Sequence, residues 1–160
     1  MESEAYALAV GKVVLDLKSL EFALRRFLDY VDMPDATMSA PLPMSIGQIL
    51  PSGALTNHAS LGQLIAKFNE SVTASKYSAV SLDPTLGDIS DTLADGHIWG
   101  SDPEPPLRIV EFSTPRNGLV SCIRDELMDD VWLDTQARRL REARTKLAQA
   151  GQEIQPGFKP

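Results

Sequence analysis

Residues 4–31, EAYALAVGKVVLDLKSLEFALRRFLDYV, are the most regular stretch of the 160-residue chain. Apolar residues recur in it at alternating spacings of four and three, which is the period of one helix face. They are Tyr6, Val10, Val13, Leu17, Leu20, Leu24, Phe27 and Val31, and Val14, Leu15, Phe22 and Leu28 widen the face. The charged residues form no regular pattern beside this face. The stretch therefore favours a core helix of a bundle over a coiled coil with a second copy.

Three further helices are predicted. One begins at Ser60, because Ser60 and Gln63 have the spacing of a capping box. The next begins at Asp83–Pro84, and Gly96 is placed to end it in a left-handed turn. The last spans residues 128–150, with acidic residues in its first turns. Their apolar faces are, in order, Leu61, Leu64, Ile65 and Phe68; Leu86, Ile89 and Leu93; and Leu133, Ala137, Leu140, Ala143, Leu147 and Ala150.

Two other segments connect these helices. Residues 32–58 contain four prolines and are expected to form a long connection with a short helical turn at Ile46–Leu50. After a proline-rich linker over residues 100–106, two apolar runs at 107–113 and 119–123 flank Asn117–Gly118. An Asn-Gly pair between apolar runs is a strong signal for a β-hairpin.

The predicted fold class is therefore mainly α, a bundle of about four helices with a small β-hairpin inserted before the last helix. Residues 1–151 are expected to be a single domain, because a chain of this length fits one core. Gly151 is expected to end the last helix, and residues 152–160 to form a flexible tail.

Composition limits the classes of function. The net charge of −7 argues against non-specific nucleic-acid binding, which depends on cationic side chains. The single cysteine, Cys122, lies in an apolar run and is expected to be buried. No apolar run approaches the ~20 residues that span a bilayer, and no basic leader is visible, so the chain is expected in the cytoplasm without a membrane.

One constellation suggests chemistry. Asp88, Asp91 and Asp95 share a face of the third helix, and His97 follows its end. The three aspartates have the ligand chemistry of a divalent-metal site, and Asp91, Asp95 and His97 are the candidate catalytic acid and base groups. The alternative, which the sequence favours, is a solvated acidic face opposite the buried stripe of the helix.

The stretch Ile89–Ile98, ISDTLADGHI, resembles the signature of HEPN-type helical domains. That signature has an Arg, then Asp or Asn, a short apolar stretch, and His–Gly–Arg. In similar members a proline-bearing linker then leads to a hairpin and to a helix that opens with an acidic residue and a Trp, as Asp130 and Trp132 do here. The resemblance implies a helical bundle that pairs as a homodimer, with RNA as the substrate class.

The sequence departs from this signature at the reacting groups. The family's RNA-cleaving Arg and His are replaced by Ser90 and Asp95, whereas Asp91 and Gly96 match and His97 stands where Arg is common. Serine lacks a positive charge and aspartate would repel a phosphate. The leading hypothesis is therefore a non-catalytic domain that acts by association with itself or with a cognate protein, in a toxin–antitoxin or defence setting, without a cofactor.

Two alternatives are kept open. One is a metal-dependent ribonuclease, or another phosphate-directed enzyme, that uses Asp91, Asp95 and His97 with a divalent metal. The other concerns a basic cluster on the last helix that could contact RNA or an acidic partner. The cluster consists of Arg138, Arg139, Arg141, Arg144 and Lys146.

Overall fold

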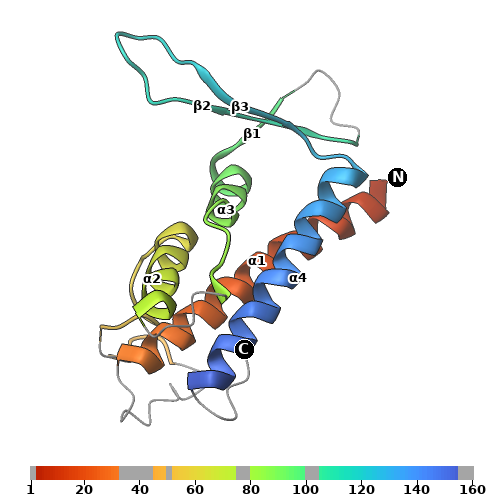
Figure 1. The fold of residues 1–160 in the computed structure, drawn as a ribbon. Coiled ribbons are helices and arrows are strands. Elements are labelled where there is room, and N and C mark those ends of the chain that lie inside the picture. The colour runs from red at the N-terminus through yellow and green to blue at the C-terminus, as the bar shows by residue number, and fades with distance from the viewer. Residues whose placement is uncertain (1–2, 33–44, 50–51, 75–79, 100–104, 155–160) are drawn as a thin grey trace.

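The computed structural model describes residues 3–32, 45–49, 52–74, 80–99 and 105–154 (Figure 1). The predicted fold class is confirmed: the chain is mainly helical, with a small antiparallel sheet before the last helix. The elements in order are α1 (Ser3–Asp32), α2 (Leu61–Ala74), α3 (Leu86–Asp95), β1 (His97–Trp99), β2 (Arg108–Phe112), β3 (Cys122–Leu127) and α4 (Asp130–Ile154).

The two long helices, α1 and α4, begin at the same end of the molecule and run side by side (Figure 1). Tyr6 lies beside the start of α4, and ten residues further along α1, Asp16 meets Arg144 at 3.8 Å. Their facing residues are almost fully buried, because the apolar stripes predicted for both helices meet here. The most buried of them are Leu20, Leu24, Leu140, Leu147 and Ala150.

The second helix, α2, completes the core against α1. The rings of Phe27 and Phe68 meet edge to face with their centroids 4.9 Å apart, and both are buried. The predicted capping box is confirmed. The Ser60 amide donates to Gln63 Oε1 at 2.9 Å, and the Gln63 amide donates to Ser60 Oγ at 3.3 Å. The predicted start of α2 was thus right to within one residue.

The third helix, α3, begins two residues later than predicted and ends differently. A turn at Pro84–Thr85 precedes it, in which Asp83 Oδ1 accepts from the Thr85 amide at 2.9 Å. The left-handed end predicted at Gly96 is wrong, since Gly96 is extended at φ −67° and ψ 147°. Glycine is needed here for space, because a Cβ would come within 2.3 Å of both Ile109 Cγ2 and the Thr92 carbonyl oxygen.

The sheet has the order β1-β2-β3 with antiparallel neighbours, so the predicted hairpin gains a third strand, β1, that was not predicted. The hairpin itself is confirmed, but its second strand is Cys122–Leu127 and not the predicted 119–123. Asn117 and Gly118 both have positive φ, 53° and 76°, and Arg116 and Leu119 close the turn with paired backbone hydrogen bonds of 2.8 and 3.0 Å. The hairpin extends beyond the helices (Figure 1).

Further boundaries differ from prediction. The predicted helical turn at Ile46–Leu50 is wrong over residues 45–49, where a tight turn closed by Gln48 N to Ser45 O contains Gly47 at φ +85°. The last helix starts at Asp130, capped by the Asp129 carboxylate on the Trp132 amide at 2.8 Å. It continues through Gly151 to Ile154, so its predicted end, and a tail beginning at 152, are wrong.

The predicted burial of Cys122 is also wrong, because its strand, β3, is the outer strand of the hairpin and the thiol is exposed. Most of the predicted connections, at 33–44 and 100–104, and the tail from 155 lie outside the described residues. In the described parts of the chain, no helix combines the length and the apolar character needed to cross a bilayer.

Candidate functional site

The predicted acidic face exists on α3. Asp88, Asp91 and Asp95 are all exposed, opposite Leu86 and Ile89, which point into the core. Partial desolvation, followed by the charges of Asp95, Asp88 and a fourth carboxylate, Glu111 of β2, raises the pKa of Asp91 above its ordinary value. The acidic face thus continues from the helix onto the sheet.

One positively charged side chain, that of Arg124, lies among these carboxylates. Arg124 of β3 lies 3.3 Å from Glu111, the residue opposite it on β2, and 3.8 Å from both Asp88 and Glu126. Its side chain retains 31% exposure, so these ion pairs are partly screened by solvent. Four carboxylates near one guanidinium, with Asp91 included, leave this junction between α3 and the sheet net negative.

A second contact fixes the sheet to α4. The Trp132 indole Nε1 donates to Glu126 Oε2 at 2.6 Å, across the junction between β3 and α4. Asp129 caps the helix that carries Trp132. Of the two residues that the resemblance named near the start of this helix, Asp130 is the first residue of α4 and Trp132 bonds the strand before it. The cap itself comes from Asp129, which the resemblance did not name.

His97 lies on the other face of the sheet from Glu111. It pairs with Val110 in the register of β1 and β2, and alternation along β2 turns Glu111 to the opposite face. The His97 ring instead meets the Phe112 ring, with centroids 6.0 Å apart. Within the described residues, no three His, Cys, Asp or Glu side chains are grouped as a metal would require. The structure thus places the three aspartates on one face of α3, but it neither groups them as a metal would require nor adds His97 to them.

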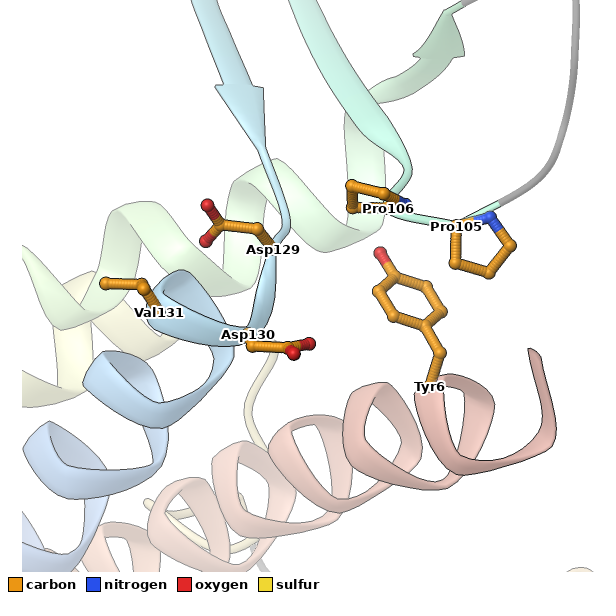
Figure 2. A pocket seen from close by; sticks show the side chains of 6 residues that line it. All are labelled: Tyr6, Pro105, Pro106, Asp129, Asp130 and Val131. Carbon is orange, nitrogen blue, oxygen red and sulfur yellow. The ribbon is translucent and has the colours of Figure 1, made fainter. Parts of the chain in front are cut away.

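A cavity of about 290 Å³ lies at the start of α1 and α4 (Figure 2). Tyr6 points into it from α1, opposite Asp129 and Asp130, and Pro105 and Pro106 close one side. The Tyr6 hydroxyl accepts a hydrogen bond from the Leu107 amide at 3.1 Å. Burial, opposed by that hydrogen bond and aided by both aspartates, raises the pKa of Tyr6. The bond between Tyr6 and Leu107 thus joins the start of α1 to the segment that leads into β2.

The basic cluster predicted on α4 is largely used within the chain. Arg139 donates to Asp83 Oδ2 at 2.9 Å and also to Thr85, and Lys146 donates to the Ser81 carbonyl at 3.1 Å. These bonds attach α4 to the segment before α3. Arg144 faces Asp16 of α1. Of the five predicted contact residues, Arg138 and Arg141 are therefore the two whose side chains have neither an ion pair nor a hydrogen bond among the described residues, and both are exposed.

Sequence reasoning missed three contributors to the acidic junction: Glu111, Arg124 and Glu126. A signal for one pair was present, because counting outward from the Asn117–Gly118 turn sets Glu111 opposite Arg124. The approach of α3 to that strand pair has no such local signal. Comparisons with protein-family models, with curated proteins and with solved structures give no match to this chain.

Proposed function

We propose that the chain is a non-catalytic association domain that binds a second copy of itself or another protein. The observation that supports this is the exposure of large apolar side chains in two groups. Leu8, Leu15 and Phe22 are 76%, 69% and 51% exposed along α1, and Leu119 and Ile123 are 75% and 58% exposed on the hairpin. Grouped exposed apolar side chains are typical of protein interaction surfaces.

The charges at the α3–sheet junction also favour a non-catalytic role. A cleaved phosphodiester needs positive charge where its own negative charge develops. Here Arg124 is already engaged by several carboxylates, and Asp95 adds negative charge where the HEPN-type signature has its His. Because of the resemblance to HEPN-type domains, we propose that this association takes place in a toxin–antitoxin or defence system.

The test is the mass of the purified chain in solution. Light scattering after size exclusion, and sedimentation velocity over a wide concentration range, should give a dimer mass that falls toward the monomer on dilution. A monomer at all concentrations would overturn self-association. Pull-down with the wild-type chain and with a Leu119→Gln, Ile123→Gln variant then tests a separate protein partner on the hairpin, since both changes are at exposed positions.

A second candidate function is a metal-dependent ribonuclease or other phosphate-directed enzyme. The observation that favours it is the exposed face of α3 that carries Asp88, Asp91 and Asp95. Partial desolvation, followed by the charges of Asp95, Asp88 and Glu111, raises the pKa of Asp91, and a divalent ion would relieve the repulsion between these carboxylates. RNA cleavage is measured with and without Mg²⁺ or Mn²⁺, for the wild type and for Asp95→Ala. The matched control is Asp134→Ala, an exposed aspartate on α4. Metal-dependent cleavage lost only in Asp95→Ala would replace the association proposal.

A further inference from the structure

The first helix has apolar residues on two opposite faces. One face forms the core with α2 and α4. The other carries residues at spacings of three and four, all exposed, which we call the outer stripe: Leu8, Gly11, Leu15, Lys18 and Phe22. We propose that a second copy of this chain packs on the outer stripe, α1 against α1 in antiparallel orientation, with Leu15 of each copy seated over Gly11 of the other. This inference rests on the proposed self-association and names its interface.

Gly11 is the observation that points to a close-packed partner. Glycine in the interior of a helix is less favourable than alanine, so its presence calls for a reason. The described residues of the single chain provide none, because a Cβ added at Gly11 would meet none of their atoms within 4 Å. A partner helix packed against α1 would supply the reason. Its backbone approaches most closely where the side chain is absent, and a leucine opposite fills the gap.

Leu15 supplies the matching side chain. It lies one turn along the same stripe and is 69% exposed, although a leucine gains stability mainly by burial. In an antiparallel pair with its two-fold axis between these two positions, Leu15 of one copy meets Gly11 of the other, and the converse holds by symmetry. One kind of contact thus occurs twice around the axis.

Charge decides the orientation. A parallel pair would set Glu4 beside Glu4, and Lys18, which is 70% exposed and pairs with Glu21 of its own helix at 3.0 Å, beside Lys18. The antiparallel pair removes these like-charge contacts. It places the Lys18 alkyl chain of one copy over Leu8 of the other, with the Lys18 ammonium one helical turn from Glu4 of that copy. It also opposes the two helix dipoles.

The first experiment compares dimer dissociation constants by sedimentation. Leu15→Gln should weaken the dimer about tenfold or more, because it is central to the contact. The control Val131→Gln makes the same change at a residue that is 73% exposed on α4, and should leave dissociation unchanged. Gly11→Leu should also weaken the dimer about tenfold or more by filling the gap. It should leave the melting temperature of the dilute monomer unchanged or raised, which excludes misfolding as the cause.

The second experiment tests orientation by disulfide trapping. In a Cys122→Ser background, a Gly11→Cys chain is mixed with a Leu15→Cys chain and oxidised. The antiparallel pair predicts mainly mixed disulfides between the two variants. Mainly like-with-like disulfides would overturn the antiparallel arrangement.

The outcomes separate this inference from the function it rests on. A wild-type chain that is monomeric throughout overturns both. A wild-type dimer that Leu15→Gln and Gly11→Leu leave intact overturns the α1 interface while self-association stands.

Discussion

The helical core and the sheet are stabilised in different ways. Leu20, Leu64 and Leu140 of the helices have no exposed surface, whereas β3 has no buried residue and projects with the hairpin. Among the described side chains of the sheet, only β2 contributes buried ones, Ile109 and Val110. The side-chain bonds that hold the rest of the sheet are polar: Arg108 bonds Asp125 at 2.5 Å, Arg124 bonds Glu111, and Trp132 bonds Glu126. The helical core is therefore stabilised mainly by burial, whereas the sheet depends more on a few directional contacts and should open at a lower free energy.

The largest effect should come from the core. Phe68→Ala removes a fully buried ring that packs on Phe27, and should cost about 3–5 kcal/mol of unfolding free energy. Urea unfolding followed by circular dichroism measures it. The control Phe22→Ala makes the same change at an exposed position of α1 and should stay within about 0.5 kcal/mol when measured on the dilute monomer. Similar losses for both would remove the distinction between the two faces of α1.

The second-largest effect on stability is expected at Gly96, where α3 meets the sheet. Gly96→Ala places a Cβ against Ile109 and the Thr92 carbonyl and should cost about 1–3 kcal/mol. Gly11→Ala, where nothing lies within 4 Å, should instead be neutral or stabilising by up to about 1 kcal/mol in the monomer. Thermal melts of the two variants should therefore shift in opposite directions. Equal shifts would mean that Gly96 is not confined by the sheet.

An intermediate effect is expected at the tip of the hairpin. Gly118→Ala introduces a Cβ at φ +76° and should cost about 1 kcal/mol locally. Because the hairpin lies outside the helical core, faster amide hydrogen exchange should be confined to β2 and β3, while α1 and α4 keep their protection. Leu119→Ala, which leaves the turn conformation available, is the control. Loss of protection throughout the chain would show that the two regions unfold together.

The smallest effect is a gain in folding stability, expected on the acidic face of α3. Asp91→Asn removes a carboxylate whose folded-state pKa is raised by partial desolvation and by Asp95, Asp88 and Glu111. A raised pKa means that the ionised group destabilises the folded state at neutral pH, so the variant should be more stable at pH 7 by about 0.3 kcal/mol after solvent screening. The gain should disappear as the pH falls below the unfolded pKa, near 3.8. Melts at pH 7 and about pH 3 test this; a loss of stability at pH 7 would contradict it.

Periodicity predicted the helical region well and the sheet only in part. The four helices have long apolar stripes, and the Ser60–Gln63 box and the Asn117–Gly118 turn are local signals. The three-residue strand β1 is too short to have a period, and its partner β2 follows only after a connection. Cys122 was misplaced because an apolar run does not reveal whether its strand lies inside the sheet or at its edge.

At the candidate site, too, local spacing predicted one part and tertiary packing decided the rest. The shared face of Asp88, Asp91 and Asp95 follows from helical spacing and is present in the fold. The addition of Arg124 and Glu111, and the separation of His97 from the aspartates, depend on how α3 approaches the sheet. That approach is set by tertiary packing at Gly96 and Ile109, which residue spacing alone does not contain.

The hydrogen bond from the Leu107 amide to the Tyr6 hydroxyl spans 101 positions of the chain, and α1 packs along α4, the helix that is made last. During synthesis, the first helix therefore leaves the ribosome long before its main neighbour exists. The side of α1 that packs on α4 stays in water until residues 130–154 have emerged, which is the condition under which nascent chains bind chaperones. Packing of α1 against α4 is thus expected to be a late step of folding, with a rate limited by closing the long loop between the two helices.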